Sequence, residues 1–298
     1  MNAAVRIPRD LYPFEGRFFE RDGLRLHHLD EGAGPPLVML HGNPTWSFCF
    51  RNLVLALRDD HRVIAPDQIG CGLSDKPDDT RYDYTLARRT DDLEALLEAI
   101  APGERVTLVG HDWGGLIGMA WAARHPERVA RLVLMNTAAF RLPEGLEVPA
   151  SMRFLRDSRL GALSVLHANL FCRAAAWLAP ARRMPRAVRR AYCAPYDTPD
   201  HRRATLRFVQ DVPLDPAHPS YEALCQVERG LALFARTPTL LLWGMRDRVL
   251  PPKVLEVFEK TWPHAEVHRF ANAGHYLLED VGDEIAARMR DFLARHPA

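Results

Sequence analysis

The sequence predicts an α/β protein, with a mostly parallel β-sheet flanked by helices and an inserted helical lid. Short apolar runs alternate with amphipathic helical segments, which is typical of a parallel sheet covered on both faces. One of these runs ends in the glycine-flanked aspartate of Gly110-His-Asp-Trp-Gly114. Between residues 141 and 229 no apolar strand is apparent, and arginine-rich helical segments replace the alternating pattern. We therefore expect a core formed by residues 1–140 and 230–298, with a cap formed by residues 141–229.

The composition indicates an ordinary globular chain. Its 298 residues are 47% hydrophobic, with a net charge of +1, so one domain with an insertion can bury a large core and nothing points to nucleic acid. No run is long and apolar enough to span a bilayer, and Met1–Arg9 has no signal-peptide core, so a cytoplasmic location is expected. Five dispersed cysteines indicate reduced thiols. We expect neither a cofactor nor a metal ion.

The amino-terminal half begins with an antiparallel lead-in and continues with buried strands and helices. Asp22-Gly23 is a typical hairpin turn between the segments around Phe18 and Leu24–Leu29. Residues 67–77 are rich in glycine and read as a loop. The regular elements expected after the hairpin are a strand over 37–40, a helix over 47–57, a strand over 63–66 and a helix over 85–100, in which Leu93, Leu97 and Ile100 share one face.

The centre of the chain is a strand, a sharp turn and a helix. The apolar run 106–109 leads into Gly110-His-Asp-Trp-Gly114, and a helix-forming segment follows through His125. This is the pattern of a nucleophile elbow, whose glycines allow a strained turn that raises the central residue above the sheet. Here that residue is Asp112, and we interpret it as a carboxylate nucleophile.

The lid and the carboxyl-terminal half follow a strand expected over 132–135. In the lid, residues 160–178 read as an apolar helix. We expect the arginines after it to form a solvated face, with contact to a partner or to an anionic surface as the alternative; they are Arg182, Arg183, Arg186, Arg189 and Arg190. The core then resumes with a strand over 239–243, a helix over 253–262, a strand over 267–270 and a helix over 280–293.

Polar residues that follow different strands meet at one edge of a parallel sheet, so they form the candidate site. His275 comes after the last strand and Asp247 after the strand 239–243. With Asp112 they follow the order nucleophile, acid, histidine of the α/β-hydrolases. We assign His275 as the general base and Asp247 as the acid that orients it.

Asn43 and Trp113 are the expected donors beside the nucleophile. Their side-chain amide and indole N–H groups are neutral donors that can converge on a leaving anion, and their backbone N–H groups can form an oxyanion hole. His41 and His111 are interpreted as structural turn residues. Asp67 and Asp75 are interpreted as caps or loop anchors.

These motifs resemble those of the haloalkane dehalogenases, a group of the α/β-hydrolase superfamily. The matching segments are His-Gly-Asn-Pro-Thr-Trp-Ser at 41–47, Gly-His-Asp-Trp-Gly-Gly at 110–115, Gly-Met-Arg-Asp-Arg at 244–248 and Ala-Gly-His at 273–275. The resemblance implies that Asn43 and Trp113 bind the leaving halide and that His275 is the base. Some dehalogenases place the acid after the preceding strand. Residues 134–140 carry no carboxylate, which favours Asp247.

A closer resemblance is to the OleB-type β-lactone decarboxylases of bacterial olefin biosynthesis. It rests on residues 67–77, Met-Asn-Thr-Ala-Ala-Phe at 135–140, Ala-Pro-Tyr-Asp at 194–197 and Arg-Phe-Val-Gln-Asp-Val-Pro-Leu at 207–214, whereas Arg248 stands where an aromatic residue is expected. The resemblance implies conversion of cis-3,4-dialkyl-oxetan-2-ones to cis-alkenes and carbon dioxide. It also suggests assembly with a β-lactone synthetase.

Three functions therefore stay open at this point. The main hypothesis is a β-lactone decarboxylase with a small hydrophobic substrate, in which Asp112 opens the strained ring at an alkyl carbon or at the carbonyl. The apolar segment 160–178 would help to house two alkyl chains or would merely pack the lid. The alternatives are a haloalkane dehalogenase and a non-catalytic ligand receptor with the hydrolase fold.

Overall fold

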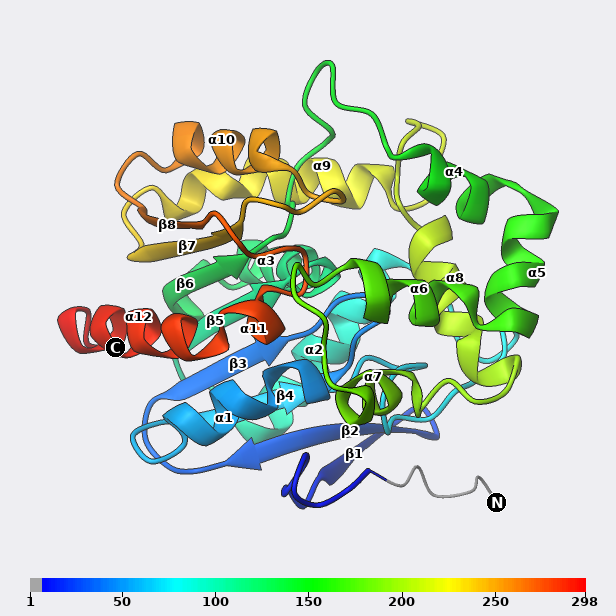
Figure 1. Cartoon of the computed structure of the whole chain (residues 1–298). Helices are drawn as coiled ribbons and strands as arrows, with labels where there is room; N and C mark the ends of the chain where they lie inside the picture. Colours follow the sequence, from blue (N-terminus) through cyan, green and yellow to red (C-terminus); the bar gives the residue numbers. More distant parts are fainter. Residues whose placement is uncertain (1–6) are drawn as a thin grey trace.

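A computed structural model of the chain describes residues 7–298, and the prediction about Met1–Arg9 therefore lies mostly outside the described residues. One eight-stranded sheet runs through the molecule in the order β1-β2-β4-β3-β5-β6-β7-β8. All strand pairs from β4 to β8 are parallel, whereas β1 and β2 form the antiparallel lead-in (Figure 1). The strands are β1 (Arg17–Arg21), β2 (Leu24–Glu31), β3 (Pro36–Leu40), β4 (Arg62–Pro66), β5 (Val106–His111), β6 (Val129–Met135), β7 (Thr239–Gly244) and β8 (Glu266–Phe270).

Helices cover both faces of this sheet. On one face α1 packs against α12, and on the other α2, α3 and α9 pack in succession (Figure 1). The central strands β3, β5 and β7 are buried along their whole length, because helices cover them on both sides. The core helices are η1 (Ser47–Phe50), α1 (Arg51–Leu57), α2 (Leu86–Ile100), α3 (Trp113–Arg124), η2 (Pro126–Arg128), α9 (Tyr221–Gly230), η4 (Leu231–Phe234), α10 (Pro252–Thr261), α11 (Leu277–Asp280) and α12 (Gly282–Arg295).

Most predicted elements are confirmed, and the differences lie at their ends. The hairpin turns at Asp22 and Gly23, whose φ angles of 53° and 70° lie in the left-handed region. Thr85 caps α2 by accepting a hydrogen bond from the Arg88 N–H, so the helix begins one residue later than predicted. β6 begins at Val129 rather than at residue 132, because Arg131 is buried within it and donates to Thr107 Oγ1.

A group of helices from the middle of the chain lies over the carboxyl ends of the strands (Figure 1). The apolar helix predicted over 160–178 is wrong as a single element, since Asn169 breaks it into two helices. Asn169 adopts the left-handed conformation, with φ 51°, and its amide donates to the Tyr196 carbonyl at 3.0 Å. The helices of this region before α9 are α4 (Ala150–Asp157), α5 (Arg159–Ala168), α6 (Leu170–Leu178), α7 (Arg186–Cys193), η3 (Asp200–Arg202) and α8 (Arg203–Gln210).

A buried ion pair joins this helical region to the core. Arg51 on α1 donates two hydrogen bonds to the Glu279 carboxylate on α11, at 2.5 and 2.8 Å. Tyr192 on α7 donates its hydroxyl to the same carboxylate at 2.6 Å. Because all three side chains are nearly excluded from water, the contact fixes α7 against α1 and α11 of the core. None of the helices in residues 7–298 is both long and apolar enough to cross a membrane.

Candidate active site

Asp112 occupies the turn between β5 and α3. Its φ and ψ of 52° and −128° are unusual for a residue with a side chain and cost about 1–3 kcal/mol. The surrounding backbone holds this conformation: the Asp112 N–H donates to the Asn136 carbonyl at 3.1 Å, and Thr137 Oγ1 donates to the Asp112 carbonyl at 2.6 Å. Gly114 is required because a Cβ there would lie 1.9 Å from the Leu40 carbonyl oxygen. This geometry is that of the predicted elbow.

The two oxygens of the Asp112 carboxylate have different surroundings. Oδ1 accepts a hydrogen bond of 2.7 Å from the Asn43 backbone N–H. The close approach needs Gly42, where a Cβ would lie 2.1 Å from this oxygen. Oδ2 lies 3.4 Å from Nε2 of His275. Oδ1 is thus held in place by the backbone, and Oδ2 faces the imidazole of His275.

His275 and Asp247 lie where the predicted triad requires them. Nδ1 of His275 is 2.7 Å from Oδ2 of Asp247, and the Asp247 side chain is fully buried. Oδ1 of Asp247 accepts hydrogen bonds from the Val249 and Leu250 backbone N–H groups at 2.7 and 3.0 Å. With both its oxygens engaged, Asp247 fixes the orientation of the imidazole and directs Nε2 toward Asp112.

Asn136 is a part of this site that the sequence reasoning missed. Its Nδ2 donates to Oδ2 of Asp247 at 2.7 Å, and its Oδ1 accepts from the Gly244 N–H at 2.7 Å. Asn136 follows β6, so the rule used for the other site residues, a polar side chain directly after a strand, would have found it. Only a carboxylate was expected to act after that strand, whereas the structure places an amide donor there.

Charge coupling between these groups sets their protonation. Burial disfavours the imidazolium, but the carboxylates of Asp247 and Asp112 outweigh it and raise the pKa of His275 to about 10. Burial likewise opposes the ionised form of Asp112, yet the hydrogen bond and charge of His275 hold the pKa of Asp112 below its usual value. The resting site is therefore an ion pair of the Asp112 carboxylate and the His275 imidazolium.

Asn43 and Trp113 flank Asp112 as predicted, although the Asn43 amide is already partly engaged. Its Nδ2 donates to the Thr205 carbonyl of α8 at 3.0 Å, which leaves one N–H for a ligand. No described residue accepts a hydrogen bond from the Trp113 indole, whose ring packs 5.2 Å from that of Phe208. The Asn43 backbone N–H, expected in an oxyanion hole, binds Oδ1 of Asp112 itself.

The remaining polar residues near the site have structural contacts. Nδ1 of His41 lies 2.8 Å from the Gly42 carbonyl, and Nε2 of His111 lies 2.8 Å from the His275 carbonyl. Buried Asp67 accepts from the Ser47 and Leu73 backbone N–H groups. Asp75 binds the backbone and guanidinium of Arg25. These contacts agree with the predicted roles as turn residues and loop anchors.

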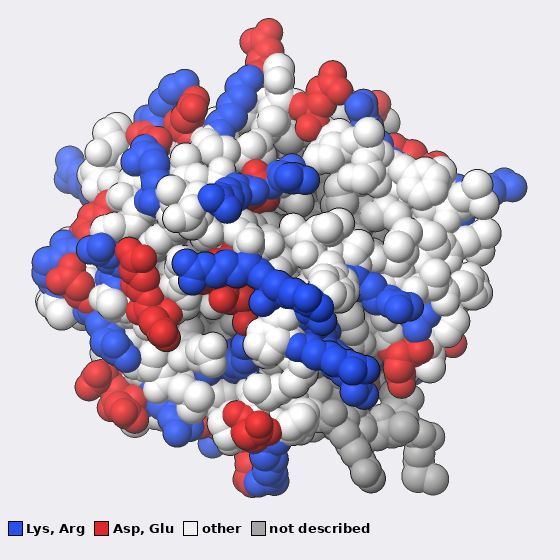
Figure 2. Space-filling model, viewed as in Figure 1, with Lys and Arg blue, Asp and Glu red and all other residues white. Residues whose placement is uncertain are grey.

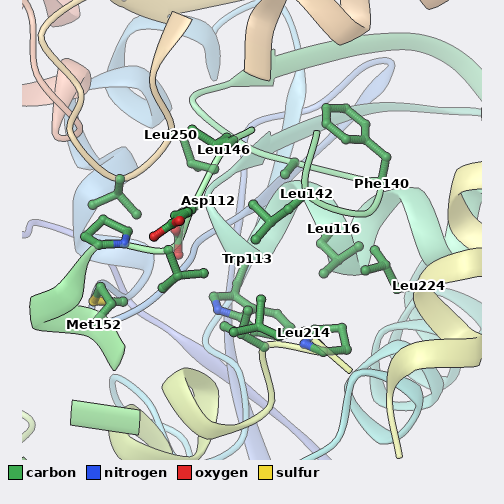
Figure 3. Close-up of a pocket in the computed structure, with 17 residues that line it drawn as sticks. Asp112, Trp113, Leu116, Phe140, Leu142, Leu146, Met152, Leu214, Leu224 and Leu250 are labelled. Atoms are coloured by element: carbon green, nitrogen blue, oxygen red, sulfur yellow. The ribbon is translucent and has the colours of Figure 1, made fainter. Parts of the chain in front are cut away.

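Two cavities meet at Asp112 and Trp113. Cavity A encloses about 910 Å³, including space open to solvent, and apart from Asp112 its only charged lining residue is Glu147. Figure 3 shows Asp112 and Trp113 between Met152 on one side and Phe140 and Leu224 on the other. Its apolar wall comes from α3, α9 and the loops before α4, after α8 and after β7, through residues that include Leu116, Leu142, Leu146, Leu214 and Leu250.

Cavity B shares Asp112, Trp113, Pro149, Met152 and Val249 with cavity A and extends between α4, α6 and the loop after β7. It encloses about 1170 Å³, again including space open to solvent, and it contains Asp112, Asp247 and His275. Its distant wall is apolar, whereas Arg246 and Arg248 lie at its edge. The apolar residues that line cavity B but not cavity A include Leu155, Phe171, Ala174, Ala175, Leu178 and Val209. No cluster of three or more His, Cys, Asp or Glu side chains suited to a metal is found within residues 7–298.

The sheet order and the strained aspartate elbow define an α/β-hydrolase. The family model of the alpha/beta hydrolase fold accordingly matches residues 35–280. The chain is 48% identical to the cis-3-alkyl-4-alkyloxetan-2-one decarboxylase of Shewanella oneidensis, over 95% of this chain and 89% of that one. It is 46% identical to the enzyme of the same name from Xanthomonas campestris pv. campestris, over 93% and 95% of the two chains.

Solved structures agree with this placement. The haloalkane dehalogenase DatA from Agrobacterium tumefaciens superposes with a TM-score of 0.84 at 27% identity, covering 94% of this chain and 96% of that one. The chain therefore belongs to the α/β-hydrolases and, within them, to the family of the cis-3-alkyl-4-alkyloxetan-2-one decarboxylases, which is related to the haloalkane dehalogenases. Both resemblances predicted from the motifs are confirmed.

Proposed function

We propose that the protein converts cis-3,4-dialkyl-oxetan-2-ones to cis-alkenes and carbon dioxide, with Asp112 as the nucleophile. The observation that carries this function is the position of Asp112 where two largely apolar cavities meet. A β-lactone with alkyl groups on adjacent ring carbons has two chains that leave the reacting centre in different directions. Cavities A and B offer one space for each chain, whereas a small haloalkane needs only one.

In the first step Oδ2 of Asp112 attacks the ring carbon that carries the ring oxygen. The carbon–oxygen bond breaks, its electron pair goes to the ring oxygen, and the opened lactone becomes a carboxylate esterified to Asp112 through its alkyl carbon. Ring strain supplies part of the driving force. The free Asn43 amide N–H and the Trp113 indole N–H are placed to stabilise the new anion.

In the second step the carboxylate leaves as carbon dioxide. The electron pair of the broken carbon–carbon bond forms the alkene, and Asp112 departs with the pair of its ester bond, so the atoms balance without water. Attack inverts the configuration at one carbon, and an anti elimination then restores the cis relation of the two chains. This stereochemical course accounts for a cis-alkene from a cis-lactone.

His275 and Asp247 have supporting roles in this reaction. The imidazolium that the resting site holds can donate a proton or a hydrogen bond at Nε2, 3.4 Å from the nucleophile. Asp247 and Asn136 keep the ring in that orientation. When Asp112 becomes an ester its negative charge disappears, so the pKa of His275 falls and the imidazole becomes a base. The same change would let water hydrolyse the ester, which is the dehalogenase alternative.

The test is an incubation with a long-chain cis-dialkyl β-lactone and, in parallel, with 1-bromobutane, following alkene and bromide. The decarboxylase function predicts alkene with little bromide, and Asp112→Ala should abolish the alkene. Steady bromide release without alkene would make the protein a dehalogenase. One turnover without recycling, or no turnover of either substrate, would favour the receptor alternative.

Two substitutions examine the two cavities separately. Leu224→Trp narrows cavity A and Ala175→Trp narrows cavity B, while Ala232→Trp on the exposed surface of η4 is the matched control. Both cavity variants should lower kcat/KM for a lactone with two long chains at least tenfold, on the order of 1.4 kcal/mol, and the control should not. If only one of the two cavity variants lowers kcat/KM, then one of the two alkyl chains of the substrate lies outside the cavities.

Three further predictions accompany this function. We propose residues 141–229 as the cap, although α9 at its end packs on α3 of the core. Assembly with a β-lactone synthetase and a cytoplasmic location stay predictions from the resemblance and from the composition. Co-purification with the synthetase and cell fractionation are the experiments that test them.

A further inference from the structure

A group of exposed apolar side chains lies on α4, α5 and α6. Six of the large hydrophobic residues between 154 and 178 are more than two fifths exposed, and Leu160 and Leu178 are 71% and 79% exposed. In Figure 2 this region forms a broad uncharged face where Figure 1 places α4, α5 and α6. We call it the cap face; its apolar members are Phe154, Leu160, Leu163, Leu170, Trp177 and Leu178. An apolar patch of this kind on a globular protein marks a contact surface.

The charges around the cap face are mainly positive, although exposed Asp157 ends α4. Residues 158–194 contain seven arginines and no aspartate or glutamate, although the whole chain carries a net charge of only +1. Blue side chains border the uncharged face over α6 and α7 in Figure 2. The seven are Arg159, Arg173, Arg182, Arg183, Arg186, Arg189 and Arg190.

These arginines lack carboxylate partners among the residues that the structure describes, whereas arginines elsewhere are extensively paired. Two of them contact Trp177 instead, with the guanidinium of Arg189 3.7 Å and that of Arg183 5.1 Å from its ring. Tryptophan beside arginine on an apolar helix surface is typical of proteins that lie in a lipid headgroup layer.

We propose that the cap face docks on the surface of an anionic phospholipid bilayer. The exposed leucines and Trp177 would enter the headgroup layer, and the unpaired arginines would bind lipid phosphates. A second copy of this chain is a poor occupant, because a symmetric contact would bring two arginine-rich surfaces together. The apolar interior of the bilayer suits the exposed leucines and Trp177. Its negative surface charge is opposite to the positive charge of the arginines.

The position of cavity B gives this docking a consequence for access to the site. Leu178 belongs to the cap face and also lines cavity B, so the cavity opens beside the apolar patch. A water-insoluble ligand could pass between the bilayer and the cavity without crossing water. This consequence rests on the proposed function, but the docking itself does not.

The experiment is co-sedimentation of the full-length protein with large unilamellar vesicles. Vesicles of phosphatidylcholine alone are compared with vesicles containing one third phosphatidylglycerol, at low and high salt. We expect at least tenfold more binding to the anionic vesicles at low salt and a marked loss at high salt. Equal binding to both vesicle types, or binding to neither, would overturn the proposal and leave a protein partner as the occupant.

Matched variants place the contact on the molecule. Leu160→Asp and Arg190→Glu alter the cap face outside the catalytic site, whereas Leu233→Asp and Arg236→Glu make the same changes at exposed positions of the η4 region. The first pair should reduce vesicle binding at least fivefold, and the second pair should leave it unchanged. Thermal unfolding checks that every variant is folded. Equal losses in both pairs would refute a contact through the cap face.

Discussion

The coupling of His275 to Asp112 leads to a prediction that can be measured without any substrate. In the resting site His275 lies between two carboxylates, 2.7 Å from Asp247 and 3.4 Å from Asp112, and its pKa is raised to about 10. Asp112→Asn keeps the shape of the side chain and removes one of the two charges. A single opposite charge at such a distance changes a pKa by about one to three. The pKa of His275 should therefore fall to between about 7 and 9.

The assay is a pH titration of the histidine ring signals by NMR. The chain has 13 histidines, so His275→Gln is needed to assign the signal. The neighbouring His111 will not be confused with it, because burial and the charge of His275 lower the pKa of His111 to about 4. The matched control is Asp197→Asn, which removes a carboxylate 2.6 Å from His201 on the cap and should leave His275 unaffected.

The result matters for mechanism because the asparagine amide imitates the charge of an esterified Asp112. A pKa near 7 in the variant would mean that alkylation of Asp112 lets His275 act as a base at neutral pH. If His275 titrates at the same pH in the variant as in the wild type, the charge of Asp112 does not control it. The change of role assigned to His275 during turnover would then be incorrect.

Four other outcomes are expected. Asn136→Leu should lower kcat about 10- to 100-fold with little change in KM, because Asp247 loses a charge-assisted hydrogen bond of about 1.5–3 kcal/mol; an unchanged kcat would contradict this role. Glu279→Gln should lower the free energy of unfolding by about 3–5 kcal/mol in urea titrations, because it leaves a buried arginine unpaired. The ion pair of the site should stabilise the fold fully just below pH 6.5, the ordinary pKa of histidine, and this stabilisation should be lost as the pH rises through about 10. It should also be lost at acid pH, below the usual carboxyl pKa of 3.8, because Asp112 is then protonated. Urea unfolding measured across this pH range tests both limits. Prolonged dialysis against EDTA should leave turnover unchanged, and a loss restored by a divalent metal would show that a metal site was overlooked.

Much of the site could be predicted because parallel strands bring distant residues to one edge. Asp112, Asp247 and His275 each follow an apolar run that is easy to recognise, and the order of the sheet places their side chains within hydrogen-bonding distance. The strands themselves were predictable because burial on both faces leaves uninterrupted aliphatic runs. Local sequence is sufficient to predict a site residue when a single strand determines where that residue lies.

The contacts that were missed depend on residues far apart in the sequence. Asn169 ends α5 in part because its amide reaches a carbonyl 27 residues further along the chain. The Asn43 amide binds the Thr205 carbonyl, 162 residues away, so the number of its free N–H groups could not be read locally. The two cavities have the same origin, since their walls combine α3, helices from the middle of the chain and loops that follow different strands.

The reacting groups alone do not decide between displacement of halide and decarboxylation, because both reactions begin with attack by an aspartate on an alkyl carbon. They differ in what the leaving group does next. A halide departs, so the ester persists until water reaches it. The carboxylate released from a β-lactone stays attached to the adjacent carbon, where its loss as carbon dioxide supplies the electron pair that expels Asp112. The substrate thus carries the second half of the reaction itself, and the protein directs the outcome by choosing which substrate reaches Asp112. We propose that the walls of cavities A and B make that choice, so substitutions there should change the reaction more readily than substitutions in the triad.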